Sequence, residues 1–229
     1  MIFNQFFDEV SSTFTYLISS GKGREALIID PVLENTNDYI LYLKKLDLKL
    51  VKVIDTHIHA DHISGMKELN KQTNCVNIMG EQSLSEVVNI KIKDNEKIKI
   101  ENIELTSMYT PGHTDCSYSF LMKDRIFTGD TLLINGTGRT DFQNGNPIDQ
   151  YHSLFDRILT LPETIFVYPG HDYKGKKVST IGDEKNNNPR LKVKTPNQYA
   201  ELMNNLNLPD PKMMDIAIPA NIKGKVLKE

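Results

Sequence analysis

The chain has 229 residues, which is enough for one large domain with a sizeable hydrophobic core. A hydrophobic content of 39% and a charged content of 25% are ordinary for a globular protein, and a net charge of −3 gives no electrostatic reason to expect binding to nucleic acid or to an anionic membrane. No apolar run approaches the roughly 20 residues that a membrane-spanning helix needs, so no membrane segment is predicted.

The first half of the chain alternates predicted strands and helices. Residues 1–8 carry neither the basic leader nor the apolar segment of a signal peptide, so we expect the chain to begin inside the fold of a cytoplasmic protein. Apolar residues at a helical period predict a helix from Thr36, and a short helix is predicted over residues 62–71. Apolar and β-branched runs predict strands at residues 13–18, 26–30, 50–54 and 75–79.

The second half continues with further strands and two helices. Asn146 and Thr195, each followed by proline, are typical helix starts, and they predict helices that end near residues 159 and 205. No repeat or linker marks a boundary, so we predict one domain over residues 1–229, with residues 206–229 as an irregular C-terminal arm packed on it. Strands are predicted at residues 97–101, 104–109, 118–122, 125–128 and 164–168, and 118–122 pairs with 125–128 as a hairpin.

The most informative segment follows the predicted strand at residues 50–54. It places His57, His59, Asp61 and His62 within six residues, and imidazole and carboxylate groups suit zinc, iron or manganese. In an extended loop, residues two apart point the same way, so His57 and His59 can face one ion. Asp61 and His62 are expected to point elsewhere, toward a second ion.

Three more candidate ligands each follow the end of a predicted strand. These are His113, Asp130 and His171, and Asp130 is placed to bridge two ions. Loops at one edge of packed sheets can converge on one site, so the pattern predicts two stacked sheets flanked by helices. His152, in contrast, lies inside a predicted helix and is expected to be structural or exposed to solvent.

The order of these residues resembles that of a known superfamily. His57-Ile58-His59-Ala60-Asp61-His62, followed by His113, Asp130 and His171, is similar to the metallo-β-lactamase fold superfamily. The resemblance implies an α/β fold, an αββα sandwich with a metal site at one edge of the sheets, but it does not decide the reaction. All seven ligand positions are present, which by itself favours a dinuclear zinc thioesterase of the glyoxalase II type, hydrolysing S-acylglutathione.

Longer motifs resemble the persulfide dioxygenases, and they extend over nearly the whole chain. They lie at residues 133–142, 171–175, 188–190, 205–209 and 218–221. This resemblance implies one Fe(II) per chain, held by the catalytic residues His57, His113 and Asp130, and a homodimer. It implies oxidation of glutathione persulfide with O2 and water to glutathione and sulfite. The remaining candidates (His59, Asp61, His62 and His171) would then orient the three ligands and bind water.

Candidates for binding the rest of the substrate follow from the charge of glutathione, which carries two carboxylates. Arg139 and Arg190 match carboxylates with their guanidinium groups, but each has the alternative of pairing with a nearby acid such as Asp141. Tyr173 is expected either to reach the metal-bound ligand with its hydroxyl or to pack against the tail.

The two cysteines, Cys75 and Cys116, predict no disulfide framework and are expected to be buried strand residues rather than nucleophiles. A non-catalytic metal-binding module is a third hypothesis, disfavoured by a ligand set that leaves one side of the metal open and by the arginines suited to substrate.

Overall fold

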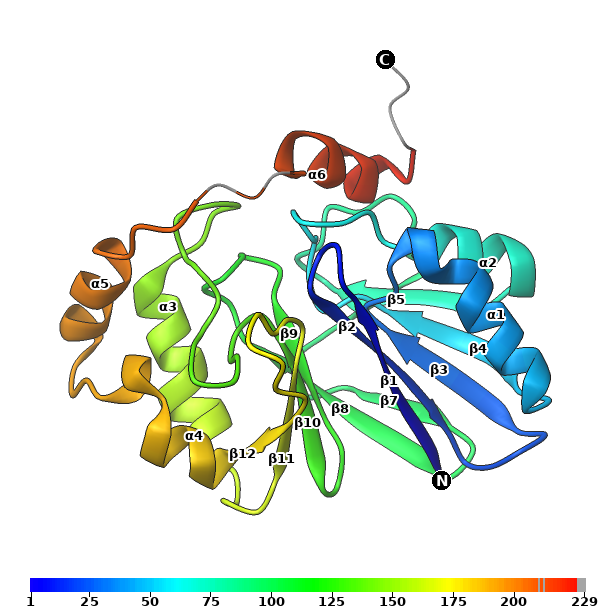
Figure 1. Cartoon of the computed structure of the whole chain (residues 1–229), viewed down its shortest axis with the longest axis horizontal. Helices are drawn as coiled ribbons and strands as arrows, with labels where there is room; N and C mark the ends of the chain where they lie inside the picture. Colours follow the sequence, from blue (N-terminus) through cyan, green and yellow to red (C-terminus); the bar gives the residue numbers. More distant parts are fainter. Residues whose placement is uncertain (210, 212, 226–229) are drawn as a thin grey trace. The chain divides into compact units, whose positions relative to one another are not determined.

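The structure of the chain is a computed structural model that describes residues 1–209, 211 and 213–225 (Figure 1). The chain divides into two compact units, and each is described by itself. Unit 1 comprises residues 1–92, 97–105 and 210–229, and unit 2 comprises residues 93–96 and 106–209. Among the described residues, no helix is both long enough and apolar enough to cross a membrane.

Unit 1 contains a six-stranded sheet whose strands lie in chain order. The first three strands form an antiparallel meander, and β3 to β6 are parallel. The strands are β1 (Ile2–Asp8), β2 (Thr13–Ser19), β3 (Glu25–Ile29), β4 (Lys49–Ile54), β5 (Val76–Gly80) and β6 (Ile90–Ile92). The unit also holds β7 (Lys97–Ile100), a 3-10 turn at Leu33–Asn35, and the helices α1 (Thr36–Lys45), α2 (Met66–Thr73) and α6 (Met214–Lys223).

The parallel pairing of β3 with β4 explains how unit 1 positions its polar residues. Ile29 pairs with Ile54, so the two strands end at the same edge of the sheet. Asp30 follows β3, and residues 55–62, which carry three histidines, follow β4, so the pairing brings them together. The strands themselves are held by apolar side chains such as Leu17, Ile28 and Val53, each fully buried and each stabilising the fold by about 1.5–3 kcal/mol.

Unit 2 is built on the strands that follow β7 in the second sheet. The order of this sheet is β12-β11-β10-β9-β8-β7, and β10 pairs with β11 in parallel. The strands are β8 (Ile103–Tyr109, of which residues 106–109 belong to unit 2), β9 (Tyr118–Leu121), β10 (Arg125–Gly129), β11 (Phe166–Pro169) and β12 (Ser179–Thr180). Its helices are α3 (Pro147–His152), α4 (Ile181–Asn187) and α5 (Pro196–Asn204), with a π-helical turn at Ser153–Arg157 and 3-10 turns at Ile158–Thr160 and Pro189–Leu191.

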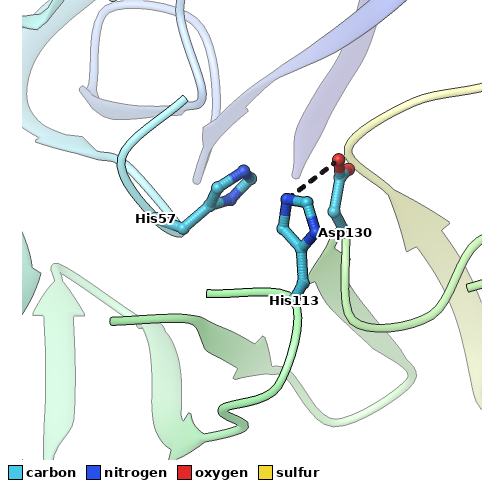
Figure 2. Close-up of side chains that lie close together, drawn as sticks. All are labelled: His57, His113 and Asp130. Carbon is cyan, nitrogen blue, oxygen red and sulfur yellow. Dashed lines mark ion pairs between the residues drawn. The ribbon is translucent and has the colours of Figure 1, made fainter. Parts of the chain in front are cut away.

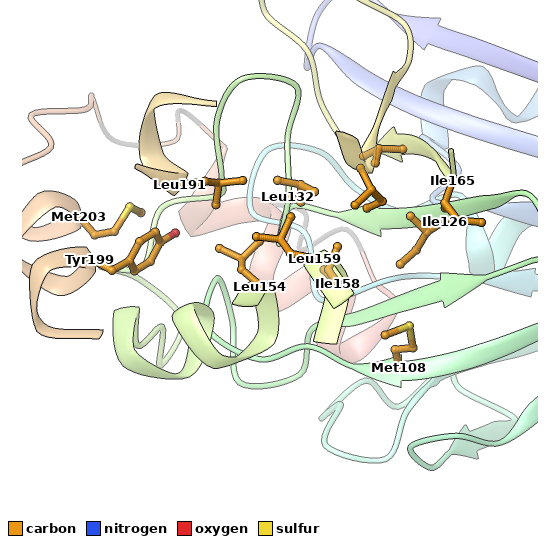
Figure 3. Packing of buried hydrophobic residues seen from close by; sticks show 12 residues of the cluster. Met108, Ile126, Leu132, Leu154, Ile158, Leu159, Ile165, Leu191, Tyr199 and Met203 are labelled. Atoms are coloured by element: carbon orange, nitrogen blue, oxygen red, sulfur yellow. The ribbon is translucent and has the colours of Figure 1, made fainter. Parts of the chain in front are cut away.

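The helices of unit 2 pack on its sheet through one apolar cluster (Figure 3). Leu154 and Ile158 from the segment after α3 contribute fully buried side chains, as do Ile126 and Val167 from β10 and β11. Tyr199 of α5 is also fully buried, and its hydroxyl donates to Gln150 Oε1 at 2.7 Å. This cluster fixes the strand ends from which the candidate ligands of unit 2 project.

Most of the predicted elements are confirmed within a few residues, including the hairpin of β9 and β10. The helix predicted from residue 62 begins only at Met66, because Ser64 and the residues before it are held in an irregular loop. The irregular arm predicted over residues 206–229 is wrong in its middle, where α6 forms. Residues 210, 212 and 226–229 of that arm lie outside the described part of the chain.

Candidate active site

The histidine loop, residues 55–62, is anchored in unit 1 by Asp30. The carboxylate of Asp30 accepts a hydrogen bond from the backbone N–H of Thr56 at 2.7 Å and another from the Thr56 hydroxyl at 2.9 Å. Asp30 has a φ of 51°, a left-handed conformation that turns the chain sharply after β3. The Thr56 hydroxyl oxygen lies 2.9 Å from His57 Nδ1, so the loop holds the ring of His57 as well.

His59 is buried between two carboxylates. Its Nε2 lies 3.3 Å from Asp30 Oδ1, and its ligand atoms lie within 4.8 Å of those of Asp30 and Asp55. Burial alone would lower the pKa of His59, but the negative charge and hydrogen bond of Asp30 raise that pKa to about 9. Burial raises the pKa of Asp55 to about 7, with the nearby charge of His59 acting in the opposite direction.

The three imidazoles of the loop lie next to one another with their planes tilted. The ring centroids of His57 and His59 are 4.2 Å apart, and those of His59 and His62 are 4.3 Å apart. Asp61 Oδ2 lies 2.9 Å from His62 Nδ1, and His59, Asp61 and His62 form a second group whose ligand atoms lie within 4.8 Å of one another. Unit 1 therefore brings together all four residues predicted from the sequence cluster.

Asn221 of α6 holds the same loop from its other side. Its side-chain amide donates to the carbonyl oxygens of His59 and His62, both at 2.9 Å. Its Oδ1 accepts from the backbone N–H of Ser64 at 2.8 Å. Because all three bonds go to the main chain, this asparagine fixes the shape of the loop without using the imidazoles.

In unit 2, the side chains of His113 and Asp130 face each other (Figure 2). His113 Nε2 lies 3.6 Å from Asp130 Oδ2. His113 Nδ1 lies 2.8 Å from the carbonyl oxygen of Arg139, which can only accept, so Nδ1 carries the proton. The lone pair is thereby placed on Nε2, the nitrogen on the side of Asp130, which is the tautomer that a metal ligand needs.

The second oxygen of Asp130 is held by His171. His171 Nδ1 lies 2.6 Å from Asp130 Oδ1, and the His171 ring is 1% exposed. Asp130 follows β10 and His171 follows β11, and the parallel pairing of these strands places both residues at the same edge. Unit 2 therefore brings together the three candidate ligands that the sequence predicted behind separate strands.

Two glycines lie so close to His113 and Asp130 that a side chain at either position would collide with the site. A Cβ at Gly138 would lie 2.2 Å from the Asp130 carbonyl oxygen and 2.8 Å from His113 Nδ1. A Cβ at Gly170 would lie 2.6 Å from Asp130 Oδ1. The main chain at Gly138 and Gly170 therefore packs directly against His113 and Asp130, and only glycine fits at these two positions.

The candidate substrate residues have different surroundings. Arg139 is already paired: Nε and Nη2 bind the two oxygens of Asp141 at 2.6 and 2.7 Å, and Nη1 binds the Pro209 carbonyl at 2.7 Å. The guanidinium of Arg190 is half-buried, and its hydrogen bonds in the described part of the chain go to Thr137. Tyr173 is exposed, and its ring stacks on that of His171 with centroids 6.1 Å apart.

The remaining predicted residues lie where the sequence suggested. Cys75 and Cys116 are buried free thiols, although each lies just outside a strand. His152 is about half exposed and pairs with Asp156, one helical turn away, at 2.7 Å.

Three residues to which the sequence assigned no role in the site contact the histidine loop. They are Asp30, Asn221 and Thr13, whose hydroxyl donates to Asp61 Oδ2 at 3.1 Å. A carboxylate at the end of an otherwise apolar strand was a usable signal for Asp30. Thr13 and Asn221 carry no local signal, because their role depends on contacts across 48 and 162 positions of sequence.

Comparison with known proteins places these features in a family. Residues 8–87 and 80–171 match the family model of the metallo-beta-lactamase superfamily. The mitochondrial persulfide dioxygenase ETHE1 of Homo sapiens is 40% identical over 226 residues, which are 97% of this chain and 88% of that protein. The crystal structure of ETHE1 from Myxococcus xanthus has a TM-score of 0.94 and 45% identity, covering 96% of this chain and 98% of that one. A probable hydroxyacylglutathione hydrolase of Schizosaccharomyces pombe is 31% identical, covering 88% of this chain and 90% of that protein.

The chain is therefore a member of the metallo-β-lactamase superfamily, with the predicted α/β fold, an αββα sandwich. Within that superfamily it belongs to the persulfide dioxygenases, since its identity to the human and M. xanthus proteins extends over nearly its whole length. The hydrolase, which would have favoured the thioesterase alternative, is more distant. The predicted fold class and the predicted family are confirmed.

Proposed function

We propose that this chain oxidises glutathione persulfide with O2 and water to glutathione and sulfite. The balanced reaction is RSSH + O2 + H2O → RSH + SO3²⁻ + 2 H⁺, in which the outer sulfur is oxidised and dioxygen is reduced. The observation that carries the proposal is the 40% sequence identity to the human persulfide dioxygenase, which extends over 97% of the chain. The pairing of His113 with Asp130, with the His113 proton on Nδ1, provides metal-ligand chemistry in agreement with it.

We propose one Fe(II) per chain, with His57, His113 and Asp130 as its ligands. Two imidazoles and one carboxylate are the donor set of non-haem iron oxygenases, and this set leaves coordination positions open on one side. The residues present fit that set, because His113 Nε2 and Asp130 Oδ2 lie 3.6 Å apart and Thr56 holds the ring of His57. When bound, iron(II) supplies the one-electron chemistry by which spin-paired sulfur reacts with triplet dioxygen.

The neighbouring polar residues orient these ligands in the proposal. His171 holds Asp130 Oδ1 at 2.6 Å, which directs the other carboxylate oxygen toward His113. Asp61 shares a hydrogen bond with His62, and Asp30 lies beside His59. In this assignment none of these neighbours is a metal ligand, and each supports the geometry of a ligand or binds water.

Arg190 is the proposed contact for a glutathione carboxylate. Its guanidinium is half-buried and binds only a carbonyl and a hydroxyl among the described residues, so charge pairing with a substrate remains open to it. Arg139 is not proposed for this role, because Asp141 already occupies its guanidinium in a bidentate pair. Tyr173, which is exposed beside His171, is proposed to offer its hydroxyl to the substrate.

Metal analysis and two assays test the function. Protein purified without oxygen is expected to contain about one iron per chain, to take up O2 with glutathione persulfide and to produce sulfite. His113→Ala is expected to lose both iron and O2 uptake, whereas His152→Ala, which changes an exposed histidine, is expected to retain both.

Other results would support other functions. Two zinc ions per chain and hydrolysis of S-lactoylglutathione without oxygen would support the thioesterase and contradict the proposal. Metal binding with neither activity would indicate a non-catalytic module. Full retention of iron and O2 uptake in His113→Ala would refute the ligand assignment.

We also propose a homodimer located in the cytoplasm. The dimer is supported by the family to which the chain belongs, and light scattering of the purified protein measures it directly. The human relative is named as mitochondrial, so the location needs its own test. Cell fractionation with an antibody to this chain is expected to find it in the cytoplasmic fraction.

A further inference from the structure

A continuous series of side-chain hydrogen bonds leads away from the histidine loop within unit 1. His62 Nδ1 lies 3.3 Å from Thr13 Oγ1, and Thr13 Oγ1 lies 2.7 Å from Ser11 Oγ. Ser11 Oγ then donates to Asp8 Oδ2 at 2.7 Å. We refer to His62, Thr13, Ser11 and Asp8 as the hydroxyl chain.

The hydroxyl chain connects the interior of unit 1 with solvent. His62 and Thr13 are buried, with 4% and 0% exposure. Ser11 and Asp8 are partly exposed and lie at the tip of the β1–β2 hairpin, next to Val10, which is 97% exposed. At its inner end, the ring of His62 lies 4.3 Å from that of His59, and the ring of His59 lies 4.2 Å from that of His57, the proposed metal ligand, as measured between ring centroids.

The hydroxyl of Thr13 lies within hydrogen-bonding distance of two acceptor oxygens, an arrangement that suits proton transfer. Its single hydroxyl proton can be donated to Asp61 Oδ2 at 3.1 Å or to Ser11 Oγ at 2.7 Å. A hydroxyl can donate one hydrogen bond while accepting others, so the same group can receive a proton from His62 and release its own. Ser11 has the same property, and the carboxylate of Asp8 ends the series as an acceptor.

The hairpin turn itself does not need these hydroxyl contacts. The backbone N–H of Ser11 already donates to Asp8 Oδ2 at 2.7 Å, which closes the turn. The contact between the Ser11 and Thr13 hydroxyls adds a link toward His62 that the turn does not require.

We propose that the hydroxyl chain carries protons from the active site to solvent during turnover. The proposal rests on the proposed function, in which oxidation of each persulfide to sulfite releases protons. His62 takes up a proton from the site at Nε2 and gives its Nδ1 proton to Thr13, Thr13 passes its own proton to Ser11, and Ser11 passes its own to Asp8. Asp8 releases one proton to water, and rotation of the hydroxyls together with return of the His62 proton from Nε2 to Nδ1 then restores the starting state. No bond between heavy atoms changes, and no electron moves.

Removal of single hydroxyls tests this role. Thr13→Val and Ser11→Ala each interrupt the hydroxyl chain, and Thr13→Ser keeps the hydroxyl while removing only a methyl group. Ser12→Ala is the matched control, because Ser12 lies in the same hairpin but outside the hydroxyl chain. A positioned proton-transfer group contributes roughly 10²–10⁴-fold to rate, and since water can partly replace a missing hydroxyl we expect kcat to fall about tenfold.

The accompanying measurements separate proton transfer from structural support. In Thr13→Val and Ser11→Ala, the solvent deuterium isotope effect on kcat is expected to increase, while KM and iron content stay at wild-type values. Thr13→Ser is expected to restore kcat, and Ser12→Ala to leave it unchanged. In metal-chelated protein labelled with ¹⁵N-histidine, the Nδ1 proton of His62 is expected to exchange with water more slowly in both interrupting variants.

Wild-type kcat and a wild-type isotope effect in both interrupting variants would overturn the proposal. So would loss of iron in Thr13→Val combined with unchanged turnover in Ser11→Ala, because Thr13 would then only support the loop. If the wild-type protein takes up no O2 with glutathione persulfide, the proposed function fails. The proton-exchange measurement still decides the hydroxyl chain in that case, because unchanged exchange in both variants would reject it.

Discussion

The main chain of Arg139 orients His113: its carbonyl oxygen lies 2.8 Å from His113 Nδ1 and accepts a hydrogen bond from that nitrogen. The side chain of the same residue binds Asp141 through two hydrogen bonds, which holds this carbonyl in place. A residue that the sequence suggested for substrate binding therefore acts on a proposed metal ligand.

Replacement of Arg139 by alanine is expected to weaken metal binding. The bidentate contact to Asp141 and the bond to Pro209 are lost, so the carbonyl that orients His113 becomes mobile. Loss of a group that orients a metal ligand typically costs 10–100-fold in metal affinity or activity. Titration with Fe(II) under anaerobic conditions measures the affinity, and a pure increase in KM with unchanged iron affinity would show that Arg139 binds substrate after all.

Replacement of Arg190 by alanine is expected to raise KM and to leave iron binding unchanged, unlike the replacement of Arg139. A charge-assisted hydrogen bond contributes about 1.5–3 kcal/mol, so KM for glutathione persulfide should rise by roughly ten- to a hundred-fold while iron content is unchanged. Steady-state O2 uptake measures this, with a persulfide that lacks the glutathione carboxylates as the comparison substrate. Equal effects on both substrates would contradict a carboxylate contact.

Gly138→Ala is expected to damage the site by collision. The new Cβ would lie 2.2 Å from the Asp130 carbonyl oxygen, so the backbone must move at a cost of about 1–3 kcal/mol, and the His113–Asp130 pair must open. Chemical denaturation and metal analysis measure the two effects. Gly136→Ala is the control, because its Cβ would meet Leu133 Cβ at an ordinary 3.9 Å.

The Arg139–Asp141 pair is expected to make stability depend on pH in the acid range. Hydrogen bonds from Arg139 lower the pKa of Asp141 below its ordinary 3.8. A group whose pKa is lowered by folding stabilises the protein above the unfolded pKa, and that contribution is lost as pH falls through the folded pKa. Urea denaturation of the wild type and of Asp141→Asn should therefore differ at pH 6 and converge as the pH drops below 3.8. A constant difference down to the lowest pH would disprove the linkage.

Asn221→Ala is expected to loosen the histidine loop. The change removes three hydrogen bonds to the main chain and leaves buried carbonyl groups of His59 and His62 without this donor, which costs about 1–3 kcal/mol. Equilibrium denaturation gives the change in unfolding free energy. Asn197→Ala, at an exposed position of α5, should change it by less than about 0.5 kcal/mol.

The sequence predicted much of the fold and the candidate ligands, because both depend on local patterns. Buried strands followed directly by histidine or aspartate are visible in the order of residues, and β4 and β10 carry them as expected. β1 was missed, since its seven residues do not alternate and are specified by their ladder with β2. The sequence could not decide whether Arg139 binds a substrate carboxylate or pairs with Asp141. The answer depends on where the guanidinium lies in three dimensions. The role of Asn221 was invisible for the same reason.

The contact between Asn221 and the histidine loop has a consequence for biosynthesis. The amide that fixes the His62 carbonyl comes 159 positions after it in the chain, so the loop cannot take its final shape while that later part is still inside the ribosome. The histidine loop therefore reaches its final shape late in folding, only after α6 has been synthesised.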